Sequence, residues 1–562
     1  MNAFGDAAAT FCATIVDEWQ RSGLTTAILA PGSRSTPLAV ALLRNPKIDV
    51  HIFHDERSAS FAALGVGLAL GVPAVLLCTS GTAATHFHAA VVEAHQSAVP
   101  LIVCTADRPP ELHGLGAPQT IDQVNLYGSA VREFFAVQVP SEQDSPNWRA
   151  LARRAFAMSV GALPGPVHLN LPFREPLLGE VGELPASEQV PSLEQLQSQN
   201  SPEETNSSDL QQLVKMIAGK QGVFIAGKGS TTAVGQLAGL LEWPILADPR
   251  SGLRSPRWPS VVAFDSLLRV GDFVDAHRPE IIIRIGEPPA SKILSQWISA
   301  CNVAVIQISP DARIFNAEKS VTLNITADIE AFFTALLAQV TPSTKSAWLT
   351  GWLDAENLAQ QAIADKLATE WSEPAIARMV SVERNGALMV SSSMPIRDVE
   401  WFGAPDDSHI LYSNRGANGI DGVVSTAVGI AMVSFDPTYL LIGDIAFIHD
   451  SNGLWNLADR NVDLRIVVVN NSGGSIFSFL PQAQVLDHLE FEQIFGTPHS
   501  VDICKLAHSY GVAAVQVTSL ADLRTELQHS GPVVIEAVTD RSSNVAQHDD
   551  LNESVAIALH NN

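Results

Sequence analysis

Positive charge is scarce in this sequence of 562 residues, which has 34 lysines and arginines against 59 aspartates and glutamates. The formal net charge is −25, so the surface repels polyanions such as nucleic acids and anionic membranes. We therefore expect neither nucleic acid nor a membrane as a partner. If the substrates are anions, the few cationic side chains must be concentrated where those substrates bind.

Cysteine is also scarce, and its spacing fits no structural site. The five cysteines include no Cys-x-x-Cys pair: Cys12, Cys78, Cys104, Cys301 and Cys504. Scattered cysteines in odd number argue against a disulfide framework or a zinc site, and they favour reduced thiols in a cytoplasmic protein. No basic stretch precedes an apolar run near residue 1, so no signal peptide is expected.

Apolar runs suited to crossing a membrane are missing as well. The segment from Phe61 to Cys78 carries no charge and comes closest in length, but it contains three glycines and Pro73. Glycine commonly follows the last turn of a helix. We therefore predict a helix that ends at Gly71, followed by a buried strand over Ala74–Cys78.

Short apolar runs alternate with longer amphipathic segments along the chain. This alternation predicts an α/β protein of doubly wound parallel sheets, with helices on both faces of each sheet. Length and two polar breaks indicate three domains, 1–181, 211–340 and 341–562, with 182–210 as a linker. The predicted elements include strands at Thr26–Leu29, Val50–Phe53, Val75–Cys78, Leu101–Cys104, Val223–Ile225, Ile281–Ile285, Val303–Ile308, Tyr439–Ile442 and Arg465–Val469, and a helix-like segment at Ser451–Asp459.

Two of these strands end in polar side chains that suit a magnesium ion. Asp444 follows the strand at Tyr439–Ile442, and Asn471 follows the strand at Arg465–Val469. Neighbouring strands of an open α/β sheet end at one edge, where ligands gather. A carboxylate, an amide oxygen and the backbone carbonyl of Gly473 are oxygen ligands that magnesium accepts, often together with a phosphate. The local alternative is a helix cap at Asp444 and a turn at the two asparagines.

The spacing from Gly443-Asp444 to Asn470-Asn471 resembles the motif of thiamine-diphosphate enzymes. That family usually has glycine where this chain has Ile445, but the ligand positions are intact. The resemblance implies that thiamine diphosphate binds with Mg²⁺, which Mn²⁺ is able to replace. It also implies that Asp444, Asn471 and Gly473 hold the metal and that 341–562 is the diphosphate-binding domain.

A second region resembles the same family. Glu56 stands where these enzymes place the glutamate that hydrogen-bonds to the pyrimidine ring of the cofactor and activates it. The loop Thr79-Ser80-Gly81 resembles a cofactor-facing loop of the family's pyrimidine-binding domain, here 1–181. Read locally, Glu56 is an acidic first-turn residue favoured by the helix dipole. In this superfamily the pyrimidine domain of one subunit faces the diphosphate domain of another, which implies a homodimer or homotetramer with active sites at the subunit interface.

Longer motifs are similar to one branch of the family, the 2-succinyl-5-enolpyruvyl-6-hydroxy-3-cyclohexene-1-carboxylate synthases of menaquinone or phylloquinone biosynthesis. The matching segments are Ala30–Pro37, Asp55–Ala59, Thr105–Leu112, Ser413–Gly422 and Asn470–Phe477. The resemblance covers nearly the whole chain. It implies a transferase that decarboxylates 2-oxoglutarate and adds the resulting carbanion to isochorismate, giving the product in the family's name and CO₂.

Both of these substrates are dicarboxylates, and arginine pairs carboxylates with a two-pronged fork. By resemblance, isochorismate faces Ser33, Arg34, Arg108 and Lys292, and the part derived from 2-oxoglutarate faces Gln119, Ser393, Arg397 and Arg415. The alternative for each arginine alone is a surface ion pair. Pro118 and Ile293 depart from the family's pattern, which often has Asn and a basic residue there, and these departures imply fewer polar and positive donors in the substrate pocket.

The remaining site residues implied by the resemblance are mainly apolar. Ile420 would wedge between the two rings of the bent cofactor, and Ser475 would contact the cofactor. Ile476, Phe477 and Leu480 would wall the site and exclude water. The alternative for the four apolar side chains is core packing.

The middle domain contains Gly227-Lys228-Gly229 after a predicted strand, but Thr232 stands where a dinucleotide loop would have its third glycine. We interpret it as a scaffold without a bound dinucleotide. Three rival functions remain at this point: a different thiamine-diphosphate 2-oxoacid decarboxylase, a non-catalytic paralogue of the fold, and a nicotinamide dehydrogenase. The last lacks a Gly-x-Gly-x-x-Gly after any predicted strand.

Overall fold

The computed structural model describes residues 3–188, 193, 195, 207–311, 313–317, 319–344, 346–407 and 410–561. Their strands form three six-stranded sheets. Contacts divide the chain into two compact units. Unit 1 comprises 1–200, 414–435 and 449–462, and unit 2 comprises 201–413, 436–448 and 463–562. Of the predicted linker, residues 189–192, 194 and 196–206 lie outside the described residues.

The first sheet belongs to unit 1 and has the strand order β2-β1-β3-β4-β6-β5. All its neighbouring strands are parallel. The strands are β1 (Thr26–Leu29), β2 (Asp49–Ile52), β3 (Ala74–Cys78), β4 (Leu101–Asp107), β5 (Glu133–Ala136) and β6 (Pro166–Pro172). The helices of unit 1 are α1 (Ala3–Arg21), α2 (Thr36–Arg44), α3 (Glu56–Leu70), α4 (Thr82–Thr85), α5 (His88–Gln96), α6 (Ser145–Val160) and α17 (Val423–Val433), with 3₁₀ turns η1 (Pro110–Leu112), η2 (Gly128–Ala130), η3 (Glu142–Asp144), η4 (Ser451–Leu454) and η5 (Leu457–Asp459).

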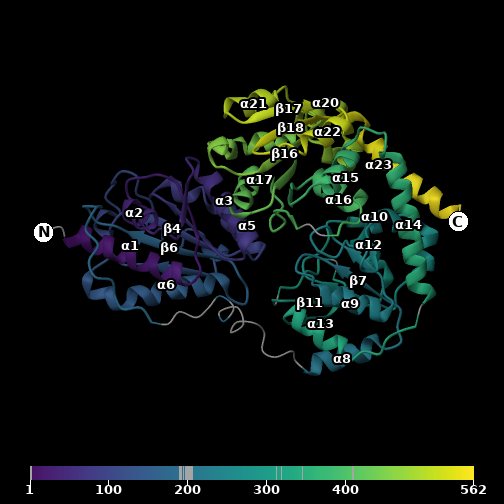
Figure 1. Ribbon diagram of the computed structural model, residues 1–562, viewed down its shortest axis with the longest axis horizontal. Helices are drawn as coiled ribbons and strands as arrows, with labels where there is room; N and C mark the ends of the chain where they lie inside the picture. Colours follow the sequence, from purple (N-terminus) through teal and green to yellow (C-terminus); the bar gives the residue numbers. More distant parts are fainter. Residues whose placement is uncertain are drawn as a thin grey trace. The chain divides into compact units, whose positions relative to one another are not determined.

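Within unit 1, α3 packs directly against α17 (Figure 1). A Cβ atom added at Gly65 of α3 would lie 2.1 Å from the carbonyl oxygen of Thr426, and one added at Gly429 of α17 would lie 2.0 Å from that of Ala62. No real side chain tolerates such distances, so the two helix backbones touch. Gly65, one of the glycines that argued against a membrane span, therefore permits this close helix crossing together with Gly429.

The second sheet belongs to unit 2, with the order β12-β11-β10-β7-β8-β9 and parallel pairing throughout. Its strands are β7 (Gly222–Ala226), β8 (Ile245–Ala247), β9 (Ser260–Val261), β10 (Ile281–Ile285), β11 (Ala304–Ser309) and β12 (Val321–Thr326). The helices around it are α8 (Ser207–Ile217), α9 (Thr232–Leu241), α10 (Phe264–Leu267), α11 (Gly271–Ala276), α12 (Lys292–Cys301) and α13 (Ile329–Leu337).

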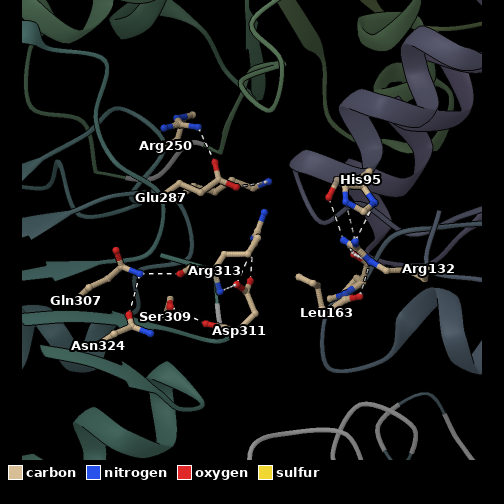
Figure 2. A network of polar contacts seen from close by, with 12 residues as sticks. His95, Arg132, Leu163, Arg250, Glu287, Gln307, Ser309, Asp311, Arg313 and Asn324 are labelled. Atoms are coloured by element: carbon tan, nitrogen blue, oxygen red, sulfur yellow. Dashed lines mark hydrogen bonds and ion pairs between the residues drawn. The ribbon is translucent and has the colours of Figure 1, made fainter. Parts of the chain in front are cut away.

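Charged side chains at the carboxyl ends of this second sheet pair with one another. Arg250 lies 3.1 Å from Asp248 and 3.0 Å from Glu287, and Lys228 lies 3.7 Å from the other oxygen of Glu287. Figure 2 shows Arg250 reaching Glu287, and Arg313 paired with Asp311 at 2.8 Å. The charged side chains named here, at this edge of the second sheet, are therefore paired with one another.

The glycines after β7 serve the packing of two loops. A Cβ atom at Gly227 would lie 1.5 Å from the carbonyl oxygen of Glu287, and one at Gly286 would lie 2.0 Å from that of Lys228. The loops after β7 and β10 therefore meet backbone to backbone. This backbone contact accounts for the glycine at position 227, so a bound phosphate is not needed to explain it.

The third sheet also belongs to unit 2, with the order β14-β13-β15-β16-β18-β17 and parallel pairing. Its strands are β13 (Ala387–Val390), β14 (Leu411–Tyr412), β15 (Thr438–Gly443), β16 (Leu464–Asn470), β17 (Ala513–Val517) and β18 (Val533–Val538). The helices are α14 (Ala347–Leu367), α15 (Glu373–Glu383), α16 (Met394–Phe402), α18 (Asp444–His449), α19 (Gln482–Val485), α20 (His488–Phe491), α21 (Ile503–Ser509), α22 (Leu520–Glu526) and α23 (Arg541–His560), with a 3₁₀ turn η6 (Ser475–Phe479) and a π turn η7 (Glu492–Gly496).

These sheets confirm the predicted α/β class with parallel sheets, and each predicted strand is present with bounds shifted by at most a few residues. The helix-like segment predicted over Ser451–Asp459 is not an α-helix. It forms the two 3₁₀ turns η4 and η5, because Asn456 between them adopts the left-handed conformation with φ 60°. The three domain boundaries stay a prediction.

All five cysteines are free thiols. Burial raises the pKa of Cys12, Cys78 and Cys104. In the part of the chain that the structure describes, no helix combines the length and the hydropathy that a membrane crossing requires.

Candidate cofactor and substrate site

The magnesium candidates meet at the carboxyl edge of the third sheet. Asp444 is the first residue of α18, directly after β15, and is only 2% exposed. One of its carboxylate oxygens accepts a hydrogen bond from the backbone N–H of Ile445 at 2.7 Å, and the other accepts one from Gly473 at 3.0 Å. The two strand ends thus touch, as the spacing predicted. Asp444 is also the first residue of α18, whereas the local alternative made it the cap residue before the helix.

Asn471 is placed so that its amide oxygen is available to a ligand. Its Nδ2 donates to Glu373 Oε1 at 2.7 Å, while its buried Oδ1 has no hydrogen-bond partner among the described residues. Glu373 Oε1 accepts this hydrogen bond, so Glu373 fixes which way the amide faces. A buried oxygen left unpaired costs free energy, and a metal ion removes that cost. The residues present therefore fit Mg²⁺.

The protein alone does not supply a full set of metal ligands here. Among the described residues, no group of three or more His, Cys, Asp and Glu side chains is arranged to hold a metal. Magnesium usually takes one or two carboxylates and completes its six-coordinate shell with phosphate oxygens and water. Asp444, Asn471 and Gly473 match such a partial set.

Sequence reasoning missed two residues that touch this set. His499 Nε2 lies 3.1 Å from Asp444 Oδ2. Burial raises the pKa of Asp444, while the N–H donors and the charge of His499 act to lower it. Burial, followed by the charge of Asp398, raises the pKa of Glu373 to about 7. No local signal could have found Glu373, which reads as an ordinary acidic residue in the first turn of α15.

Behind this edge, a buried hydrogen-bond chain joins three helical segments of unit 2. Ser475 accepts from Asn544 at 2.6 Å, the Asn544 carbonyl contacts His548 at 2.8 Å, and His548 lies 2.6 Å from Asp398. Asp398 follows Arg397 in α16. The chain thus connects the segment that carries Ser475 to the helix that carries Arg397.

Two predicted substrate residues, Ser393 and Arg397, lie together at the start of α16. Arg397 donates to the backbone carbonyl of Ser393 at 2.6 Å, and Ser393 adopts φ 77°, which is strained for a residue with a side chain. Burial lowers the pKa of Arg397. Strained backbone such as that of Ser393 occurs often at binding sites, and here it is hydrogen-bonded to the half-buried guanidinium of Arg397.

In unit 1, Glu56 begins α3 but does not cap it. Asp55 accepts from the N–H groups of Arg57 and Ser58 and is the N-cap residue. Among the described residues the half-buried Glu56 side chain makes no hydrogen bond. Burial and then the negative charge of Glu56 raise the pKa of Cys78, the last residue of β3, which directly precedes the Thr79-Ser80-Gly81 loop.

That loop is fixed by buried amides. Gln123 is fully buried, accepts from the Gly81 N–H at 2.9 Å and donates to Asn170 at 2.9 Å. Ser80 Oγ donates to the backbone carbonyl of Gln119 at 2.9 Å, and the Gln119 amide donates back to the Ser80 carbonyl at 3.0 Å. Gln119 is exposed, and its left-handed backbone (φ 56°) lets this loop pair form.

Arg34 and Arg108 converge beside the same loop. Arg108 donates to Ser80 Oγ, and desolvation followed by the charge of Arg34 lowers the pKa of Arg108. Arg34 donates to the Phe173 carbonyl and to Glu175, both at 3.0 Å, while its buried Nε has no partner among the described residues. Two guanidinium groups with an unpaired donor suit a carboxylate.

The other predicted residues are divided between the two units. Ser33, Ile420 and Arg415 belong to unit 1, with Ser33 and Ile420 exposed. Lys292 is an exposed first residue of α12 in unit 2. Unit 2 also carries Ile476, Phe477 and Leu480 on and after η6, where Phe477 packs on Phe495 with ring centroids 5.2 Å apart. Core packing is thus excluded for Ile420 and Leu480, which are 36% and 37% exposed.

Comparisons with known proteins identify the family. Three family profiles match in order: the N-terminal TPP binding domain of thiamine pyrophosphate enzymes at residues 10–126, their middle domain at 188–390, and their C-terminal TPP binding domain at 403–537. A 2-succinyl-5-enolpyruvyl-6-hydroxy-3-cyclohexene-1-carboxylate synthase of Listeria innocua is 39% identical over 98% of both chains. The chain belongs to this synthase family.

Other members of the synthase family cover the chain equally well. The proteins of the same name from Thermobifida fusca and Chloroflexus aurantiacus are 41% and 38% identical over 97% and 95% of this chain, and over 98% and 94% of their own lengths. The family match extends across both units, so the sites of unit 1 and unit 2 belong to one enzyme family. The roles of the individual site residues stay predictions.

Proposed function

We propose that this protein, with thiamine diphosphate and Mg²⁺ bound, joins 2-oxoglutarate to isochorismate with loss of CO₂. The product would be 2-succinyl-5-enolpyruvyl-6-hydroxy-3-cyclohexene-1-carboxylate. The observation that carries the proposal is the unpaired, buried Oδ1 of Asn471 beside Asp444 and Gly473. Membership of the synthase family supports the choice of substrates.

In this proposal Asp444, Asn471 and the Gly473 carbonyl hold Mg²⁺ against the diphosphate. When bound, thiamine diphosphate supplies the reactive carbon that attacks a 2-oxoacid and accepts the electrons released with CO₂. Ser475, whose Oγ accepts from Asn544, keeps its own hydroxyl proton to donate to the diphosphate. Glu56 hydrogen-bonds to the pyrimidine ring.

The substrate carboxylates pair with the arginines. Arg34 and Arg108 receive isochorismate, with Ser33 and Lys292 as further contacts. The carboxylates of 2-oxoglutarate are held by Ser393, Arg397, Arg415 and Gln119. Desolvation and then the charge of Arg34 lower the pKa of Arg108, and a bound dicarboxylate relieves the repulsion between the two arginines. The site would be lined, and water excluded from it, by Thr79, Gly81, Ile420, Ile476, Phe477 and Leu480.

The decisive experiment mixes the protein with 2-oxoglutarate, isochorismate, thiamine diphosphate and Mg²⁺, and follows CO₂ and the coupled product. We expect CO₂ and product in equal amounts. Release of CO₂ without coupling would assign the chain to the simple 2-oxoacid decarboxylases. Binding of cofactor with no turnover at all would identify a non-catalytic paralogue.

We also propose that the active protein is a homodimer or a dimer of dimers, with Glu56 of one copy facing Asp444 of another. The superfamily arrangement supports this. Glu56→Gln and Asp444→Ala should each be inactive, and Glu56→Gln should still bind the cofactor. Mixing the two inactive proteins under exchanging conditions should restore activity, since one of the two mixed sites is intact. Mixtures that stay inactive despite exchange would place both residues in one copy.

A further inference from the structure

A buried carboxylate outside the predicted site holds the loop 414–422, which carries Arg415 and Ile420. Glu93 lies on α5 and is 3% exposed. Its two oxygens accept from the backbone N–H groups of Gly416 at 2.8 Å and Ala417 at 2.6 Å, and one of them also accepts from Ser97 Oγ at 2.7 Å. The carboxylate therefore binds the two peptide groups that follow Arg415.

Close packing supports the same contact independently. A Cβ atom added at Gly416 would lie 2.7 Å from Ser97 Oγ, 2.8 Å from Gln96 Cβ and 2.9 Å from the Glu93 carbonyl oxygen. Any side chain at Gly416 would push the loop away from α5. The absence of a side chain there brings the loop backbone within reach of the Glu93 carboxylate.

The two ends of the loop are held from the other side by α17. Asn414 donates to Thr426 Oγ1 at 3.0 Å, and Thr426 donates to the Gly422 carbonyl at 2.8 Å. Glu93 thus supplies the middle attachment of a loop whose ends are already fixed. Because this attachment joins the peptide groups next to Arg415, it determines where the arginine side chain starts.

We propose that Glu93 is a positioning residue for substrate recognition: it fixes the backbone beside Arg415 so that the guanidinium meets a carboxylate of 2-oxoglutarate. The inference rests on the proposed function of Arg415. A carboxylate has two acceptor oxygens for three neutral donors, whereas a glutamine amide has one oxygen and an NH₂ group that repels N–H donors. Glu93→Gln therefore leaves at least one of these three donors unpaired and displaces the loop.

The test is the steady-state kinetics of the Glu93→Gln holoenzyme. Leaving one of these partly buried donors unpaired should weaken the binding of 2-oxoglutarate by a factor on the order of 10, so KM for 2-oxoglutarate should rise by about that much. KM for isochorismate and the affinity for thiamine diphosphate with Mg²⁺, measured by calorimetry, should stay within about twofold of wild type. A general loss of structure would instead change all three quantities together.

Three companion variants sharpen the test. Ser97→Ala removes one donor but leaves both loop contacts, so its effect on KM for 2-oxoglutarate should be smaller. Arg415→Lys should raise the same KM, and the double variant with Glu93→Gln should be less than multiplicative, since both changes act on one contact. Glu142→Gln, an exposed charge-matched change on η3, should leave every quantity unaltered.

The outcomes separate the two proposals. A KM for 2-oxoglutarate within twofold of wild type in Glu93→Gln, or an equal rise for both substrates and the cofactor, overturns the role of Glu93. An unchanged KM in Arg415→Lys, or a wild type that does not use 2-oxoglutarate, overturns the proposed function instead. If Glu93→Gln does not fold, Glu93→Asp, which keeps the charge on a shorter side chain, must show the same selective rise.

Discussion

The second and third sheets of unit 2 share one architecture but end differently. At the carboxyl edge of the second sheet, Arg250 pairs with Asp248 and Glu287, so the edge is electrically satisfied. At the same edge of the third sheet, Asp444 lies among N–H donors and His499, and Asn471 keeps a buried oxygen unpaired. The same fold thus forms a scaffold at the second sheet, where the charged side chains pair with one another. It forms a candidate binding site at the third sheet, where a buried amide oxygen has no hydrogen-bond partner.

The largest effect should come from Asp444→Ala in the third sheet. Loss of the proposed carboxylate ligand should weaken Mg²⁺-dependent binding of thiamine diphosphate by more than about 100-fold, and activity should vanish with it. Titration calorimetry with and without Mg²⁺ measures the change. Binding that remains as tight as in wild type would remove Asp444 from the metal site.

Glu373→Met should have the next largest effect, because it removes the acceptor that orients Asn471 while keeping the volume of the side chain. We expect Mg²⁺ affinity to fall by about 10–100-fold, the usual cost of losing an outer-sphere partner. Glu373→Gln is the matched control. Its amide oxygen still accepts from Asn471, so it should retain most of the affinity, and equal losses in both variants would argue against an orienting role.

Asp248→Ala in the second sheet should act on stability and leave catalysis intact. Breaking a buried pair costs about 3–5 kcal/mol, and we expect the low end because Glu287 still pairs Arg250. Thermal unfolding should show the loss as a lower Tm. The kcat measured well below that Tm should match wild type, and a selective fall in kcat would mean that the second sheet takes part in the reaction.

Lys228→Ala should have the smallest effect. Its ammonium lies 3.7 Å from Glu287 and is partly exposed, so the free energy of unfolding should fall by less than about 1 kcal/mol. Denaturant unfolding measures this change. A loss as large as that of Asp248→Ala would show that the charges at this edge act as one network.

The sequence predicted the sheets and the meeting of Asp444 with Gly473, because apolar runs and strand-end polar residues are local signals. Resemblance to the family also predicted that Arg34 and Arg108 both face isochorismate, and this role stays a prediction. The sequence could not predict the hydrogen bonds of Glu373 and Glu93, whose partners lie 98 and 323 residues away in the chain. Their contacts depend on how helices pack on sheets, and neither residue differs locally from a solvated acid. The expected helix at Ser451–Asp459 failed for a local reason, the left-handed Asn456.

The contact of α3 with α17 through Gly65 and Gly429 also bears on how this chain can evolve. Where two backbones touch, neither glycine can be replaced even by alanine unless the helices separate. We therefore expect every single substitution at either position to destabilise the protein. A saturation mutagenesis library selected for growth should therefore tolerate only glycine at both positions, while neighbouring α17 positions accept several residues. The pair also marks a poor place for recombination, since chimaeras exchanging α17 between distant relatives must preserve both glycines at once.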